Sequence, residues 1–273
     1  MTKKPQAASF DLESLVESHL NLQVKISYPV HQSFMVRHQM KECTSILDVG
    51  TGNGSFVARL AADHPSIQFV GVDKRKKCIE NCRKLVSGNL EVKQVDLFSH
   101  GDGFDFSKFD GFLLRYFLLH VDHSKKILEL FKLKSKRPAK FWIIDLDFSS
   151  FLCNPPSAVF DKFTQLVKEF CLKASSDSMA GQRVLPMLQD LDYQNSVVEH
   201  IPFSSESISM DDFALYLKQE VQCYSRMGGR PINDPETAEI IRFIDEEVRS
   251  GRYQISYGMI LIYAELNRPS ELF

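Results

Sequence analysis

Short apolar runs alternate with amphipathic stretches through the middle of the chain. The apolar runs occupy residues 45–49, 67–72, 90–95, 109–114 and 141–146. Their length and their bounding turn residues are typical of buried strands, whereas residues 55–62 and 123–133 have helical spacing. Asp122 is the expected N-cap of the second helix. This alternation predicts an α/β protein with a parallel sheet and right-handed crossovers.

A leader of 44 residues precedes the first apolar run. Its apolar residues follow helical spacing from Leu12 to Leu22, Tyr28-Pro29 is expected to break the helix, and residues 32–41 resume the pattern. The leader, residues 1–44, could be a lid over a ligand or a helix packed on the edge of the sheet. The pattern leaves both open.

A long excursion, residues 149–254, follows the fifth apolar run. Its predicted elements are helices at 157–174, 180–191, 210–227 and 235–249 and a strand at 196–203. The final run, residues 254–266, has the most β-like composition of the chain. Phenylalanine and tyrosine recur in the excursion at Phe148, Phe151, Phe160, Phe163, Phe170, Phe213, Tyr216 and Tyr224. They could line a pocket for an apolar acceptor or pack the helices against the sheet.

The composition is that of an ordinary globular protein, with 44% hydrophobic and 25% charged residues in 273. A net charge of -2 disfavours a constitutive nucleic-acid binder. The run Lys74-Arg75-Lys76-Lys77 could bind phosphate or form the solvated first turn of a helix. No apolar run approaches the ~20 residues that span a bilayer, and the polar residues 1–9 lack a secretory core, so we expect a cytoplasmic protein.

The six cysteines do not form a metal-binding pattern. Cys78 and Cys82 share a helix face, but no second closely spaced pair completes a zinc site. We expect reduced, mostly packed thiols and no metal.

A glycine turn follows the first apolar run and indicates a nucleotide-type ligand. Gly50, Gly52 and Gly54 allow a tight turn and close approach of a ligand to the backbone. The third glycine comes one residue earlier than in the dinucleotide fingerprint, and Asp48 stands two residues before the first. A carboxylate there would repel a pyrophosphate but suits an ammonium and a sulfonium. S-adenosylmethionine carries both cations and no phosphate, so it fits better than NAD.

Two further acids end the next two apolar runs. Asp73 lies 19 residues after Gly54, where an acid accepts hydrogen bonds from ribose hydroxyls. Asp96 ends the third run and can accept from an adenine amino group, while Leu97 and Phe98 can pack on the ring. Three acidic strand ends in series behind such a turn are strong evidence for this ligand.

These residues resemble the class I S-adenosylmethionine-dependent methyltransferases. The resemblance covers residues 45–146, and its motifs are Asp48-Val49-Gly50-Thr51-Gly52-Asn53-Gly54, Gly71-Val72-Asp73, Val95-Asp96-Leu97-Phe98 and Leu118-Leu119-His120. Within the superfamily the chain resembles the small-molecule branch, of ubiquinone-biosynthesis or caffeate O-methyltransferase type. It departs from both at Lys136-Arg137-Pro138, where they have a Pro-Gly-Gly turn.

The resemblance implies a Rossmann-like sheet of seven strands with helices on both faces and an antiparallel last strand. Residues 45–148 would form the cofactor-binding core, residues 149–254 the helical excursion with the sixth strand and a substrate lid, and residues 255–273 the final strand. Acceptor specificity would then reside in the leader and the inserted helices. The same segments could instead form a homodimer interface.

The resemblance also assigns roles to single residues. His120, at the carboxyl edge of the sheet, matches the base of caffeate-type enzymes, but in the ubiquinone type a histidine there is structural. Arg115 and Tyr116 would line the methionine end of the cofactor, although Arg115 could equally pair with a surface acid. Thr51 and Lys74 complete the expected cofactor-binding set.

The leading interpretation is methyl transfer to a small organic acceptor, with O-methylation favoured because of His120. A methyltransferase for tRNA, rRNA or protein is the first alternative, and a non-catalytic S-adenosylmethionine-binding protein is the second. Asn154-Pro155-Pro156 is similar to an amino-methylation motif, but it follows the fifth run rather than the fourth and Ser157 replaces the aromatic residue. We therefore expect these prolines to start the next helix, with Asn154 or Pro155 at its boundary.

Overall fold

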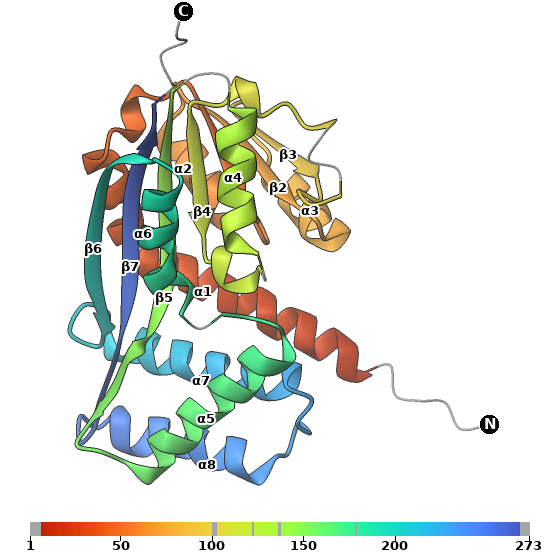
Figure 1. Ribbon diagram of the computed structural model, residues 1–273. Coiled ribbons are helices and arrows are strands. Elements are labelled where there is room, and N and C mark those ends of the chain that lie inside the picture. Colours follow the sequence, from red (N-terminus) through yellow and green to blue (C-terminus); the bar gives the residue numbers. More distant parts are fainter. Residues whose placement is uncertain (1–6, 100–102, 122, 136–137, 178, 268–273) are drawn as a thin grey trace, which may run out of the picture. The chain divides into compact units, whose positions relative to one another are not determined.

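The computed structural model describes residues 7–99, 103–121, 123–135, 138–177 and 179–267. One seven-stranded sheet has the strand order β3-β2-β1-β4-β5-β7-β6 (Figure 1). The strands are β1 Ser45–Val49, β2 Gln68–Asp73, β3 Leu90–Gln94, β4 Gly111–Arg115, β5 Ala139–Asn154, β6 Gln194–Ser204 and β7 Gln254–Leu266. Strands β1 to β5 are parallel and β7 is antiparallel, which confirms the predicted fold class.

The helices flank this sheet (Figure 1). They are α1 Ala7–Arg37, α2 Ser55–Asp63, α3 Lys76–Cys82, α4 Ser124–Lys134, α5 Ala158–Lys173, α6 Ala180–Asp190, α7 Met210–Met227 and α8 Pro235–Phe243. The short helical turns are η1 Met40–Glu42, η2 Arg83–Leu85, η4 Phe106–Lys108, η5 Leu118–His120 and the π-helical turn η6 Ile244–Val248. No helix in the described part of the chain is both long and apolar enough to cross a bilayer.

Side-chain caps begin several of these helices. Ser157 accepts from the Val159 N–H at the start of α5, so the helix begins after the two prolines and not at Asn154 or Pro155 as predicted. Asn154 is the last residue of β5. Asp234 accepts from the Thr237 N–H, and a proline follows it at the first position of α8. Asp122, the predicted cap of α4, lies outside the described residues, as do Lys136 and Arg137.

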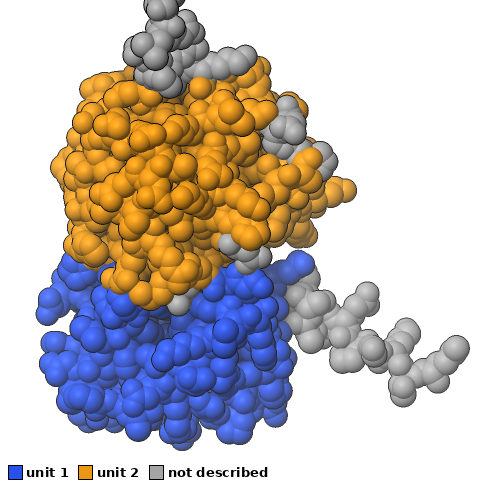
Figure 2. Space-filling model, in the orientation of Figure 1, with its two compact units in different colours: residues 1–27, 148–176, 202–258 blue, residues 28–147, 177–201, 259–273 orange. Residues whose placement is uncertain are grey.

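The chain divides into two compact units (Figure 2). Unit 1 contains residues 1–27, 148–176 and 202–258, and unit 2 contains residues 28–147, 177–201 and 259–273. The core of unit 2 lies around β1, β4 and β5, where the Phe112 and Phe141 rings stack with centroids 4.8 Å apart. In unit 1 Phe151 contacts Phe160, Phe163 and Tyr257, so much of the aromatic set of the excursion packs this unit.

The predicted break at Tyr28-Pro29 is wrong, because α1 continues through Pro29. Proline cannot donate the hydrogen bond that a residue at this position would make to the carbonyl four residues earlier, which normally disfavours a helix interior. Here the surrounding turns are held by packing, since Ser27, Tyr28 and His31 are buried. The Ser27 hydroxyl also donates to the Gln23 carbonyl at 2.7 Å. Tertiary contacts have overridden a local helix-breaking signal.

Strand register brings the predicted site residues to one edge of the sheet. Val49 of β1 is level with Val72 of β2 and with Leu114 of β4. Asp73 is level with Gln94, and Arg115 with Ile144. The residues after β1, β2, β3 and β4 therefore leave the sheet from the same carboxyl edge, where open α/β folds bind ligands.

Candidate active site

The glycine turn has the backbone that its sequence requires. Gly50, Gly52 and Gly54 have φ of 71°, 61° and 78°, all in the left-handed region. A Cβ on Gly50 would collide with the Phe117 ring, whereas the nearest atom to a Cβ on Gly52 would be the Gly50 carbonyl oxygen at 4.0 Å. The space over Gly52 is thus open, and a ligand can approach the backbone there.

Hydrogen bonds tie this turn to the end of β2. The Gly50 and Thr51 N–H groups donate to the Val72 carbonyl at 2.8 and 2.9 Å. The Gly52 N–H donates to the Asp73 carboxylate at 3.1 Å. The conformation of the glycine turn therefore depends on Asp73, the residue that we expect to bind ribose.

Asp73 is buried and already accepts several hydrogen bonds. Besides Gly52, the Arg75 backbone N–H donates to it at 2.8 Å and the Arg75 Nε at 3.3 Å. A carboxylate has about four acceptor positions. A terminal nitrogen of Arg75 also donates to Asp73, at 3.5 Å, so a ligand hydroxyl would replace the long bonds from the Arg75 side chain. Lys74, the adjacent predicted contact, has an exposed side chain, and its carbonyl accepts from Gln94 Nε2 at 3.1 Å.

The segment after β3 presents an acid and an exposed ring. The Asp96 carboxylate accepts from the Phe98 N–H at 3.0 Å, and this bond lowers the pKa of Asp96. Leu97 is buried, whereas 57% of Phe98 is exposed. An exposed phenylalanine at the carboxyl edge of the sheet is a suitable surface for a planar ring to stack on.

Asp48 lies behind the glycine turn and is only 4% exposed. Burial raises its pKa to about 6, while the Thr51 hydroxyl and the positive charge of Arg115 limit the rise. A second positive charge placed next to this carboxyl would hold it ionised. The site thus contains a carboxylate that a cationic ligand stabilises.

Arg115, at the end of β4, is held between aromatic rings. Its guanidinium lies 4.6 Å from the centroid of the Phe56 ring and 4.5 Å from that of Tyr116. Its Nε donates to His31 Nδ1 at 3.3 Å. Tyr116 follows with a φ of 50°, and its N–H donates to the Ile144 carbonyl at 2.7 Å.

His120 ends the short turn η5, and part of the residue is accessible to solvent. Desolvation by neighbouring atoms and the charges of Arg75 and Lys74 lower its pKa, so the imidazole is neutral at pH 7. The turn is anchored by Asp145, whose carboxyl accepts from the Leu119 N–H at 3.1 Å. Burial raises the pKa of Asp145 to about 7.

Sequence reasoning missed four residues that line or support this site: His31, Phe56, Asp145 and Met259. His31, Phe56 and Met259 come from three distant segments of the chain. The sequence around each residue has an ordinary apolar pattern that does not indicate a site. Asp145 did carry a signal, because a carboxyl inside the apolar run at 141–146 needs a buried hydrogen-bond partner.

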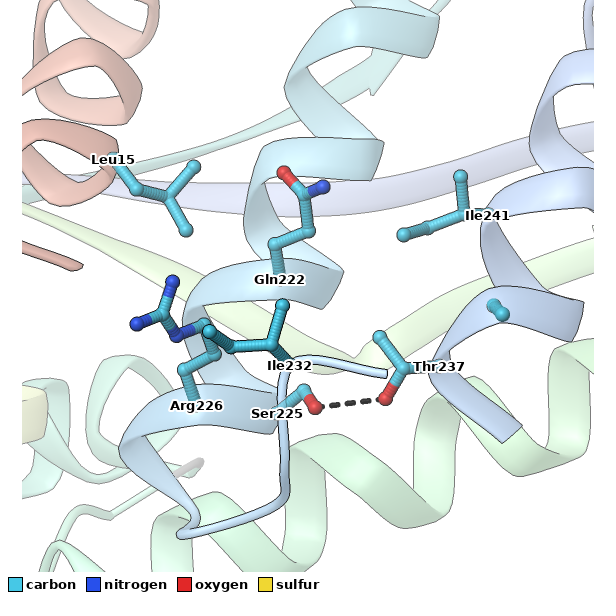
Figure 3. Close-up of a pocket in the computed structure, with 8 residues that line it drawn as sticks. Leu15, Gln222, Ser225, Arg226, Ile232, Thr237 and Ile241 are labelled. Atoms are coloured by element: carbon cyan, nitrogen blue, oxygen red, sulfur yellow. Dashed lines mark hydrogen bonds between the residues drawn. The ribbon is translucent and has the colours of Figure 1, made fainter. Parts of the chain in front are cut away.

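Unit 1 has a pocket of its own, with a volume of about 200 Å³ (Figure 3). It is lined by Leu15, Gln222, Ser225, Arg226, Ile232, Thr237, Ala238 and Ile241. At its base the Ser225 and Thr237 hydroxyls lie 2.7 Å apart, and Thr237 also donates to Asp234 at 2.7 Å. None of the predicted cofactor residues lines this pocket. Among the described residues, no group of three or more His, Cys, Asp or Glu side chains could hold a metal ion.

Residues 40–196 match the model of a family described as the methyltransferase domain. The chain belongs to this methyltransferase family. It is a class I enzyme, and its cofactor is S-adenosylmethionine. No curated protein matches the sequence significantly.

Solved structures share the fold of this methyltransferase at low identity. The YcgJ protein of Bacillus subtilis is 18% identical, with a TM-score of 0.55 over 88% of this chain and 100% of that one. The plantazolicin methyltransferase BpumL, solved with a triazolic desmethylPZN analog and SAH, is 13% identical, with a TM-score of 0.55 over 94% and 91%.

A Haemonchus contortus phosphoethanolamine N-methyltransferase is a third example. Its structure contains phosphomonomethylethanolamine and S-adenosylhomocysteine. It is 12% identical, with a TM-score of 0.53, and the match covers 82% of this chain and 49% of that one. At such identities the likeness shows the fold alone.

Proposed function

We propose that this methyltransferase acts on a small organic acceptor and favours O-methylation, with the cofactor bound along the carboxyl edge of β1 to β4. The observation that carries this placement is the position of Asp48 and Arg115 near the carboxyl ends of the neighbouring strands β1 and β4, where the arginine charge favours the ionised carboxylate. An α-amino acid has one ammonium and one carboxylate, and a carboxylate beside a guanidinium is complementary to both.

The remaining residues fit the other parts of the cofactor. Gly52 offers an open backbone surface, and two ribose hydroxyls would take the Asp73 acceptor positions that the Arg75 side chain now holds. Asp96 would accept from the adenine amino group, and the exposed Phe98 ring would stack on the base. The cofactor would also contact Thr51, Gly54, Leu97, Lys74 and Tyr116.

S-adenosylmethionine supplies a methyl group on a positively charged sulfur, which is already a good leaving group. The chain must then hold an acceptor in line with that methyl and exclude water. A hydroxyl acceptor must also lose a proton. The neutral His120 imidazole can accept one, although its lowered pKa makes it a weak base. The alternative is that His120 only shapes the wall of the pocket.

Two observations support a small acceptor over RNA or protein. BpumL and the Haemonchus contortus enzyme were each solved with a small molecule bound. In this chain the basic run at 74–77 is partly neutralised, because Arg75 pairs with Asp73 at 3.3 Å and Lys76 with Glu80 at 3.8 Å. A catalytic His120 would indicate the caffeate type, and a structural His120 the ubiquinone type.

Methyl transfer from radiolabelled S-adenosylmethionine tests this proposal. The panel contains phenols and catechols, primary and secondary amines, bulk tRNA and an unfolded protein. We expect transfer to a member of the hydroxyl class, and transfer to tRNA or protein alone would contradict a small acceptor.

The variant His120→Asn separates the two roles of the histidine. If His120 is the base, this variant should bind S-adenosylhomocysteine as the wild type does but turn over at least tenfold more slowly, in line with ordinary contributions of general bases of about 10²–10⁴. Turnover equal to that of the wild type would assign His120 a structural role.

A further inference from the structure

The second half of α1 brings a fully buried histidine into the site. His31 is 0% exposed and lies beside Arg115 and Met259. Its Nδ1 is 3.3 Å from Arg115 Nε, and its Nε2 is 3.3 Å from Met259 Sδ. None of the roles proposed above uses this residue.

The partners of His31 determine where its proton lies. A guanidinium can only donate, so Nδ1 must accept from Arg115. The neutral ring then carries its proton on Nε2, which donates to the Met259 sulfur. Burial and the charge of Arg115 hold the pKa of His31 well below its usual value, so the ring remains neutral. The Tyr116 hydroxyl donates to the same sulfur at 3.3 Å.

These contacts restrain the Arg115 guanidinium on several sides. The Phe56 and Tyr116 rings lie 4.6 and 4.5 Å from it, and the His31 ring lies 5.9 and 5.8 Å from those two rings. The groups come from α1, α2, the end of β4 and β7. An arginine restrained in this way loses little conformational freedom when it binds an anion, which favours tight binding.

We propose that His31 is a positioning residue that orients Arg115 to bind the carboxylate of the methionine part of the cofactor. This inference rests on the proposed placement of the cofactor. Its chemistry is specific, because a neutral acceptor at the Nδ1 position holds Nε of the guanidinium and leaves the positive charge of Arg115 for the carboxylate of the ligand. A protonated histidine or an aliphatic side chain at position 31 would release Arg115.

Two ligands and two variants of His31 test this role by calorimetry. S-adenosylhomocysteine has the carboxylate, whereas 5′-methylthioadenosine keeps the adenosine and the sulfur but lacks the amino-acid part. His31→Asn keeps an acceptor near the Nδ1 position. His31→Leu has nearly the same volume as histidine but lacks the acceptor. Asparagine is smaller and packs less well, so any affinity that His31→Asn recovers comes from its acceptor and not from packing.

We expect His31→Leu to bind S-adenosylhomocysteine about tenfold more weakly than the wild type, because the contact between Arg115 and the ligand carboxylate is no longer oriented. Its affinity for 5′-methylthioadenosine should stay within about twofold of the wild type. His31→Asn should recover most of the difference. In an Arg115→Gln background, His31→Leu should cause no further loss. If His31→Leu does not fold, His31→Gln replaces it, because its amide reaches the Nε2 rather than the Nδ1 position.

Equal weakening of both ligands, or unchanged affinity for S-adenosylhomocysteine, would overturn the role of His31. Failure of the wild type to bind either ligand would instead contradict the placement of the cofactor. The two failures are therefore distinguishable.

Discussion

The Asp48 carboxyl and the Arg115 guanidinium lie at the ends of neighbouring parallel strands, close enough for the arginine charge to stabilise the carboxylate. Burial nevertheless keeps the pKa of Asp48 at about 6. The site before binding is therefore not fully ionised at mildly acidic pH. A bound amino-acid group would place its ammonium beside Asp48 and its carboxylate beside Arg115, so its affinity should depend on the ionisation of Asp48.

Cofactor affinity should rise with pH between about 5 and 7. The ammonium of the ligand favours ionised Asp48, so binding below pH 6 must release the proton that the free carboxyl carries. Above pH 7 the carboxyl is ionised before binding, and the affinity should level off. Titration with S-adenosylhomocysteine from pH 5 to pH 8 measures this, and Asp48→Asn should bind weakly with no slope. A flat profile for the wild type would contradict this role.

Gly52→Val should abolish binding of S-adenosylhomocysteine by filling the open space over the turn. Valine at positive φ also costs about 1–2 kcal/mol of backbone strain, so the variant needs a control with equal strain. Gly251 has a φ of 80°, and a Cβ at this position would meet no atom within 4 Å, so Gly251→Val provides the control. Both variants should lose similar stability on thermal unfolding. Retained binding in Gly52→Val would mean that the turn is not the site.

Asp73→Ala should weaken S-adenosylhomocysteine binding by roughly 1.5–3 kcal/mol, the usual effect of removing hydrogen bonds to a charged acceptor. It also leaves the Gly52 N–H without its carboxylate partner. Asp105→Ala is a suitable control, because Asp105 also accepts a backbone N–H, from Ser107 at 3.1 Å, but lies on an exposed turn. Equal affinity in Asp73→Ala and the wild type would remove Asp73 from the ribose site.

Glu220 in unit 1 should make stability depend on pH. It is 2% exposed, accepts from the Tyr224 hydroxyl at 2.9 Å, and burial raises its pKa to about 7 from an ordinary value of 4.5. Between these two values the folded state binds more protons than the unfolded state, so stability should fall as the pH rises.

Glu220→Gln keeps an acceptor for Tyr224 and cannot ionise. We expect it to be more stable than the wild type at pH 8 by roughly 1–3 kcal/mol, and similar at pH 4.5, in urea denaturation. An equal effect of the substitution at both pH values would show that the Glu220 carboxyl does not titrate in this range.

The acids at the strand ends could be predicted from the sequence because their signal is local. Asp73 and Asp96 each end an apolar run of strand length, Asp48 is the penultimate residue of the first run, and parallel register brings the ends of these runs to one edge. The same reasoning located the final strand, Gln254–Leu266, with its observed bounds.

Long-range contacts could not be predicted in this way. His31 reaches the site because α1 continues past Pro29, and packing, not local propensity, decides that continuation. Met259 reads as one residue of an apolar strand, and only the sheet order places its sulfur beside His31 and Tyr116.

Calorimetric titration of the wild-type protein with S-adenosylhomocysteine, with NAD as the control, tests the proposed cofactor site most directly. We predict micromolar binding of S-adenosylhomocysteine that Asp48→Ala and Asp73→Ala both weaken, and no binding of NAD. Binding that neither substitution affects, or binding of NAD instead, would contradict the placement of the cofactor along β1 to β4.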